Sequence, residues 1–444
     1  MMTLTFIKRW WFLLFYLLIY FLAINAVVLN RFWQFEAFYF DHGIYDSSLW
    51  QVAHFQKPLI DHLENGFISQ FGDHFTPTMY LLTPLYRITS AYEPLLIMEN
   101  FFLLASAFVL FLVAKSKIAN KLLVFAIIFA YTLFIGLQNA VIANFHTELI
   151  TVLTLSLTLL CLEKRKWRWY WLFLILTLGT KQNFAAIGVG LGFYLLFINR
   201  KMGLSTIIFS LVYYFLITKF IISNYLYSPV FNFSWNSMKA ETVFTSLATF
   251  GFLPLGAITF LPAIFQDFIT RFFFTSSARW DLGLHYNATL SILLAYGSIL
   301  TASKLNKKFL TFFAILIILI TLYFHRFKYH GALGLSYNPD FYRHTQEMKF
   351  LKDFIFQIPP NKTVMTLNNL APYLTHTNKV MLLRGDYKNY SPEIIALDTR
   401  SGQNPANFWP TNYETLTNLP ISISTDSAYN LRRVSDTLYI FIRK

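Results

Sequence analysis

Apolar runs long enough to cross a membrane divide the first three quarters of the chain. A membrane-spanning helix needs about 20 mostly apolar residues, and residues 10–30 form the first such run, after Lys8 and Arg9. No small-x-small cleavage pattern follows it, so we interpret it as a retained anchor and not as a signal peptide. Further spans are predicted at residues 94–114, 121–139, 147–162, 168–181, 184–199, 203–223, 287–303 and 308–324.

The apolar stretch at 243–268 is interrupted by Pro254 and Pro262. Proline removes a hydrogen bond from a helix interior, and the spans on either side require this stretch to cross twice or not at all. Two short half-helices satisfy both conditions. Broken helices at membrane depth are tolerated where they are buried in protein or line a cavity, so the break indicates a cavity.

Beyond residue 324 no apolar run has the length of a span. Runs beginning at Lys362, Lys379 and Thr437 predict short strands, and residues 340–357 predict an amphipathic helix. The pattern therefore predicts a membrane domain over 1–324 and a small extracytoplasmic C-terminal α/β domain over 325–444. The fold class is an α-helical polytopic membrane protein with about 9–11 transmembrane helices and a long first outer loop over residues 31–93.

Charge predicts the orientation of the helices. Alternate ends of the predicted spans carry 14 Lys or Arg and one acid, Glu163, whereas the other loops and helix ends up to residue 324 carry 8 Lys or Arg and 12 acids. Lys and Arg are enriched in cytoplasmic loops. The N-terminus is therefore expected in the cytoplasm, and the acidic loops and the C-terminal domain are expected outside.

Composition narrows the class of protein. Hydrophobic residues make up 56% of the 444 residues and charged residues 13%, against about 25% charged in a soluble domain. An ordinary soluble enzyme, a disordered chain and a nucleic-acid binder are excluded. The single cysteine, Cys161, excludes a disulfide framework and a cysteine-based zinc site.

The first outer loop carries the acid–histidine pairs Asp41-His42 and Asp73-His74, with Asp46 close to the first of them. A carboxylate placed just above the membrane can act as a general base, or hold a metal ion or a sugar hydroxyl. The alternative is a solvated loop in which these side chains cap helices.

Polar residues also interrupt the outer ends of later spans. His146 and Glu148 lie between two spans, and Lys181 lies between the next two. Ionisable groups at the membrane edge are costly and often functional, although each could instead extend to the interface. Thr147 could simply cap the helix that follows.

Two arginines, Arg271 and Arg279, precede the span at 287–303, together with His285 and Tyr286. Cations on the outer side run against the topological bias and need an explanation. A phosphate at the membrane surface would supply one, because Arg pairs phosphate with two hydrogen bonds. Pairing with acids of the outer loops is the alternative.

In order, these motifs resemble a known family. The set is Phe40-Asp-x-Gly-Ile-Tyr-Asp, His74-Phe-x-Pro, Phe145-His-x-Glu, Thr180-Lys and His285-Tyr. It resembles the uncharacterised membrane proteins catalogued as domain of unknown function 2079. That family is similar in turn to type C (GT-C) glycosyltransferases, which take sugars from polyprenyl-phosphate carriers on the outer membrane face.

The resemblance implies a GT-C-like fold and a role for each motif. Asp41 matches the essential acid of the first outer loop and would be the general base, with Asp46 as its catalytic neighbour. His42, Asp73, His74, His146, Glu148, Lys181, Arg271, Arg279, His285 and Tyr286 would bind substrate. The family has two acids after the lysine where this chain has Gln182 and Asn183, which is expected to leave Lys181 free for a phosphate instead of a neighbouring carboxylate.

The implied function is transfer of a sugar from a polyprenyl-phosphate carrier to a glycan, lipid or protein acceptor of the envelope. A lipid-linked glycan flippase and a non-catalytic assembly subunit are the alternatives. No cofactor is required by this interpretation, and a divalent metal ion held by Asp41 and His74 stays open. The expected location is a bacterial plasma (inner) membrane, with membrane lipid and no nucleic acid as partners.

Overall fold

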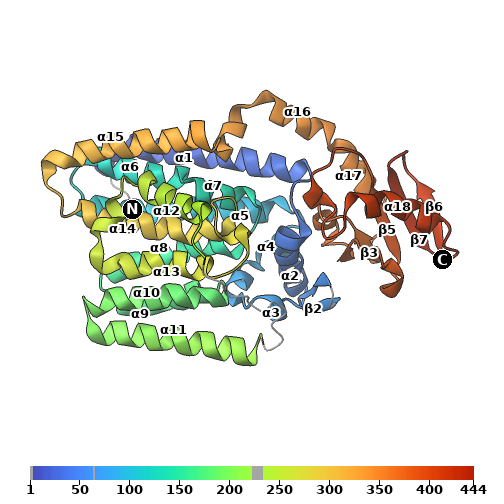
Figure 1. Ribbon diagram of the computed structural model, residues 1–444, viewed down its shortest axis with the longest axis horizontal. Coiled ribbons are helices and arrows are strands. Elements are labelled where there is room, and N and C mark those ends of the chain that lie inside the picture. The colour runs from blue at the N-terminus through green and yellow to red at the C-terminus, as the bar shows by residue number, and fades with distance from the viewer. Residues whose placement is uncertain (1–3, 64–65, 223–233) are drawn as a thin grey trace. The chain divides into compact units, whose positions relative to one another are not determined.

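The computed structural model describes residues 4–63, 66–222 and 234–444, which form two compact units (Figure 1). The first, here called the helical unit, comprises Met1–Val27, His74–Met79 and Ile97–Tyr337. The second, here called the sheet unit, comprises Val28–Asp73, Tyr80–Leu96 and Asn338–Lys444.

A helix occupies every span predicted from the sequence. The helices are α1 (Leu4–Trp33), α5 (Glu93–Lys117), α6 (Lys121–Leu133), α7 (Ile135–Ile142), α8 (Thr147–Glu163), α9 (Trp167–Leu178), α10 (Ala185–Leu196), α11 (Arg200–Phe220), α14 (Ala288–Ala302) and α15 (Lys307–Tyr323). Residue 223, the predicted end of one span, lies outside the described residues.

Four of the described helices are long and apolar enough to cross a membrane, at Lys8–Trp33, Glu93–Lys117, Arg200–Phe220 and Lys307–Lys328. The bent pair α6 and α7 makes a fifth if it is one span. The chain is therefore a membrane protein with several spanning helices, and the total of 9–11 stays a prediction.

The break predicted in the stretch 243–268 is confirmed. Helix α12 (Ser237–Thr249) ends before two short turns at Leu253–Gly256 and Ile258–Phe260, and α13 (Leu261–Phe272) follows. Pro254 and Pro262 both lie at the first or second position of a new turn, where the missing N–H of proline is not needed.

The sheet unit is built on a mixed sheet with strand order β4-β3-β5-β7-β6. Strand β3 (Thr363–Thr366) is parallel to β4 (Lys379–Leu382) and to β5 (Ile394–Asp398), whereas β7 (Leu438–Arg443) is antiparallel to β5 and to β6 (Tyr429–Arg433). The three predicted strands are confirmed.

The helices of the sheet unit are α2 (Ile44–Ala53), α3 (Gln70–Asp73), α4 (Leu85–Ile88), α16 (Pro339–Glu347), α17 (Lys349–Ile355) and α18 (Tyr413–Ser424). The single helix predicted over 340–357 is wrong in one respect, because α16 and α17 are separate helices on either side of Met348.

The first loop and the C-terminal residues share one hydrophobic core. Phe35, Tyr39 and Ile60 from the loop are buried in the same cluster as the strand residues Val364 and Ile395. A hairpin from the loop, β1 (Leu59–Asp61) with β2 (Phe67–Ser69), belongs to the same unit. The first loop and the C-terminal residues lie on opposite sides of the domain boundary that the sequence predicts at residue 324. That boundary, as the end of the membrane domain, stays a prediction.

Candidate functional site

Asp41 lies in a single π-helical turn, Tyr39–Gly43, that runs directly into α2. Such turns are rare and often found at functional sites. Asn368 holds two backbone N–H groups of this turn. The carbonyl of Asn368 accepts from the Tyr39 N–H at 2.8 Å, and the side-chain oxygen of Asn368 accepts from the Phe40 N–H at 3.1 Å. The Asp41 residue itself is only half-buried. A carboxylate is thus presented on a fixed backbone and stays partly accessible.

Asp46, one helical turn further on, is fully buried. It accepts hydrogen bonds from the Tyr86 hydroxyl and, at 2.7 Å, from the Thr375 hydroxyl, and its Oδ2 lies 2.9 Å from Nε2 of His376. Burial alone would raise the pKa of Asp46, but the His376 imidazole holds that pKa below its usual range. Asp46 is therefore an ionised internal anchor, and its predicted catalytic role stays a prediction.

His376 is held from every side. Its ring stacks between Trp50 and Tyr92, at 4.1 and 4.0 Å between centroids. Its Nδ1 lies 3.0 Å from the carbonyl of Ser90, while Nε2 faces the Asp46 carboxylate. The two ring nitrogens thus face a carbonyl and a carboxylate oxygen, which fixes the orientation of the imidazole. His376 was not among the predicted site residues, because its Thr-His-Thr context gives no local signal and every partner is distant in sequence.

The other first-loop residues have structural partners within the sheet unit. His42 is buried, with its ring 5.8 Å from that of Phe32. Asp73 lies 3.7 Å from Nε2 of His62. Asp61, which the sequence analysis did not single out, forms a buried ion pair with Arg384 at 2.7 Å.

An apolar groove of about 590 Å³ lies beside the Asp41 turn in the sheet unit. It is lined by the end of α1, the start of α5 and one side of α17. Phe32, which contacts His42, forms part of its wall. The aromatic lining residues are Phe32, Trp33, Phe35, Tyr92, Phe356 and Tyr373. Two exposed lysines, Lys349 and Lys352, and one acid, Glu93, also line the groove.

A second group of predicted residues meets in the helical unit. Nζ of Lys181 lies 2.7 Å from Oε1 of Glu148, and Nε2 of His285 lies 3.6 Å from the same oxygen. The rings of His146 and His285 stack at 3.9 Å. All four residues are buried. The expectation that Lys181 is free for a phosphate is wrong, because Glu148, far away in sequence, takes the place of the lost acids.

The surroundings of this cluster explain the residues beside it. His146, and not Thr147, is the N-cap of α8, and it makes no side-chain capping bond, so the capping role considered for Thr147 is wrong. The backbone N–H of His146 donates to buried Glu99 at 3.3 Å, an acid that the sequence analysis did not single out. Gln182 reaches Nδ1 of His74 at 3.2 Å.

The two arginines differ in their surroundings. Arg271 is buried and donates to Asp267 at 2.9 Å and to Asn287 at 2.8 Å. Its acidic partner is on its own helix and not in an outer loop. Arg279 is only partly buried, with its guanidinium 4.3 Å from the ring centroid of Phe274 and 5.3 Å from that of Tyr286.

Within the described residues no three His, Cys, Asp or Glu side chains lie close enough together to hold a metal ion. Asp41 belongs to the sheet unit and His74 to the helical unit. A metal ion held by Asp41 and His74 stays a prediction.

Several apolar helices of spanning length and a small C-terminal mixed sheet, with buried ion pairs in both units, are the features of a multi-pass membrane protein. Comparison with protein families gives the finer assignment. The chain belongs to the family of predicted membrane proteins known as DUF2079, whose model matches residues 31–234 and 224–437. No curated protein matches the chain.

Proposed function

We propose that this protein is a membrane glycosyltransferase that moves a sugar from a polyprenyl-phosphate carrier to an acceptor outside a bacterial plasma membrane. One observation carries the proposal. One compact unit holds a partly accessible carboxylate, Asp41, on a fixed turn, and an apolar groove lies next to that turn. The groove is formed where two spanning helices, α1 and α5, end and begin, and two lysines of α17 line it. The GT-C-like resemblance of the sequence motifs supports the same activity.

The groove suits the lipid-phosphate part of the donor. Its aromatic side chains lie where α1 ends and α5 begins, which is where Trp and Tyr concentrate at membrane interfaces. Lys349 and Lys352 would meet the phosphate as cations. This assignment replaces Lys181 and Arg271 as the main phosphate contacts, because both are already paired with buried carboxylates.

Asp41 would act as the general base. Its carboxylate takes the proton of the acceptor hydroxyl as that oxygen attacks the anomeric carbon of the sugar. The bond between the anomeric carbon and the phosphate oxygen breaks, and the polyprenyl phosphate leaves with the electron pair. Attack opposite the leaving group inverts the configuration of the sugar. Asp46 is then a positioning residue, which holds α2 and the turn in place through Tyr86, Thr375 and His376.

The test compares lipids and envelope glycans by mass spectrometry in cells that lack the protein. The cells are complemented with wild type, Asp41→Asn or Asp340→Asn at matched membrane levels. Asp340 is an exposed acid paired with exposed Arg343, so it is the control. We expect wild type and Asp340→Asn to restore the missing sugar, and Asp41→Asn to accumulate a polyprenyl-phosphate sugar.

Two outcomes would count against the proposal. Full restoration by Asp41→Asn would remove the base assignment. A sugar carrier that stays confined to the cytoplasmic leaflet in cells without the protein would favour the flippase alternative.

A second arm tests the groove through Lys349→Gln/Lys352→Gln. Basic residues near an anionic lipid contribute about 1 kcal/mol each, so the double variant should raise the KM for the lipid-linked donor roughly tenfold or more, with a smaller change in kcat. Lys388→Gln, at an exposed lysine outside the groove, should leave both unchanged. An unaltered KM in the double variant would mean that the two lysines of the groove do not bind the donor.

A further inference from the structure

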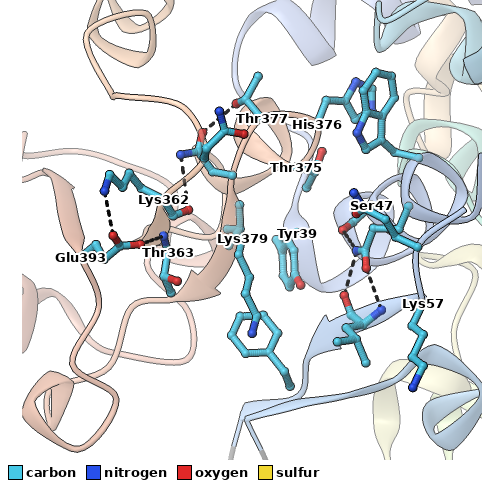
Figure 2. Close-up of a pocket in the computed structure, with 18 residues that line it drawn as sticks. Tyr39, Ser47, Lys57, Lys362, Thr363, Thr375, His376, Thr377, Lys379 and Glu393 are labelled. Carbon is cyan, nitrogen blue, oxygen red and sulfur yellow. Dashed lines mark hydrogen bonds and ion pairs between the residues drawn. The ribbon is translucent and has the colours of Figure 1, made fainter. Parts of the chain in front are cut away.

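A second cavity in the sheet unit is polar and basic. It has a volume of about 560 Å³ and is lined from the first loop and from the amino-terminal ends of β3 and β4 (Figure 2). Three lysines contribute, Lys57, Lys362 and Lys379, against one acid, Glu393. Four side-chain amides also line it, at Gln51, Gln56, Asn361 and Asn378, with hydroxyls at Ser47, Thr363, Thr375 and Thr377.

The positive charge of this pocket is only partly balanced. The Glu393 carboxylate forms an ion pair with Lys362 at 2.9 Å and accepts a hydrogen bond from the backbone N–H of Thr363 at 2.8 Å. Nζ of Lys379 lies 3.8 Å from the ring centroid of Phe67, and neither Lys379 nor Lys57 has a carboxylate partner in the part of the chain that the structure describes. Two ammonium groups therefore remain to meet an anion.

The rest of the lining favours hydroxyl groups over a stacked sugar ring. Trp50 is the largest aromatic residue in the wall, but His376 and His54 lie at 4.1 and 4.0 Å from its ring. Gln51 is held rigid by Ser47 and by both backbone groups of Leu59. Recognition here would rest on hydrogen bonds and charge, which suits a hydroxylated ligand that carries an acidic group.

We propose that this pocket binds an acidic glycan, through a carboxylate or phosphate group held by Lys57 and Lys379, and that this glycan is the acceptor. The proposal rests on the proposed function and deepens it. Tyr39, in the same turn as Asp41, is one of the lining residues, so the pocket adjoins the turn that carries the base. The two lysines come from opposite ends of the chain, and only the folded unit brings them together.

Binding is tested with the purified full chain in nanodiscs of zwitterionic lipid, so that no anionic lipid competes. The ligands are digalacturonic acid, glucose 6-phosphate, inorganic phosphate and maltose, titrated by calorimetry. We expect one or both of the acidic sugars to bind at least tenfold more tightly than maltose and inorganic phosphate. Which acidic sugar binds distinguishes a carboxylate from a phosphate.

Variants assign that binding to the pocket. Lys57→Gln/Lys379→Gln should weaken it at least tenfold, whereas Lys388→Gln should not change it. Equal affinity for maltose, equal affinity for inorganic phosphate, or unchanged binding by the double variant would each overturn the proposal.

Asp41→Asn separates this proposal from the transferase proposal. It should bind the acidic sugar as wild type does while failing to restore the envelope glycan in cells. Suppose the protein binds the acidic sugar but Asp41→Asn still restores the envelope glycan. The pocket would then stand as a glycan-binding site, and the transferase proposal would be wrong. If Asp41 is essential but no acidic sugar binds, the proposal for the pocket would be wrong and the transferase proposal would stand.

Discussion

Two aspartates five residues apart have opposite surroundings. Asp46 is enclosed by Tyr86, Thr375 and His376, whereas Asp41 is half-buried on its turn. Their positions in the sequence predict a pair of aspartates with shared chemistry. The local sequence does not indicate which of the two is buried. The partners of Asp46 are 40 and about 330 residues away, so its burial is decided by tertiary contacts alone.

Replacing Asp46 by Asn should destabilise the protein. The change would remove the carboxylate that His376, Tyr86 and Thr375 contact, and losing one partner of a buried polar contact costs about 1–3 kcal/mol. Thermal unfolding of the protein in detergent measures the effect. Asp41→Asn and Asp340→Asn should both stay close to wild type in the same assay. A wild-type melting temperature for Asp46→Asn would mean that the contact with His376 adds nothing to stability.

The same anchor predicts a dependence of stability on pH. The pKa of Asp46 is lowered in the folded protein, so its carboxylate stabilises the fold above the unfolded-state pKa of about 3.9. That contribution is lost as the pH falls through the lower folded value. His42, Tyr86, Tyr92 and His376 face this carboxylate. Melting temperatures measured from pH 6 down to pH 3 should fall less steeply for Asp46→Asn than for wild type, and parallel curves would contradict this.

At the scale of elements, the apolar pattern and proline positions predict most of the fold. Each predicted span contains a helix, and the turns after α12 begin next to Pro254. Two features escaped prediction. The break at Met348 has no proline or glycine to indicate it, and the pairing of first-loop residues with the C-terminal sheet joins segments about 300 residues apart.

Close packing of α10 on α11 depends on glycine. A β-carbon at Gly203 would lie 2.6 Å from the backbone nitrogen of Leu196 and 2.8 Å from the carbonyl oxygen of Gly192. Small residues let membrane helices approach closely, and overpacking costs about 1–3 kcal/mol. Gly203→Ala should therefore lower the melting temperature in detergent.

Gly72→Ala is the matched control for that substitution. Its β-carbon would meet only the Ile68 side chain, at an ordinary 3.7 Å. Equal melting temperatures for the two alanine variants would show that the two helices can separate without loss of stability.

At the scale of the whole molecule, the fold constrains topology independently of charge. Residues Val28–Asp73 and Tyr80–Leu96 form one compact unit with Asn338–Lys444 and share its core, so we expect these segments on the same side of the membrane. The distribution of Lys and Arg, which the sequence alone reveals, predicts that this side is the outer one. The charge bias therefore predicts that the Asp41 turn, the apolar groove and the polar pocket all lie on the outer face.

Cysteine labelling tests that arrangement. The single native cysteine, Cys161, is buried, so one exposed cysteine can be introduced at a time without a competing site. A membrane-impermeant maleimide should label Ser435→Cys in spheroplasts, because Ser435 is exposed on the sheet unit. Lys164→Cys, exposed beside the basic cluster after α8, should react only once the membrane is permeabilised. The reverse pattern would put the sheet unit in the cytoplasm, and a transferase drawing on outer-leaflet carriers would then be impossible.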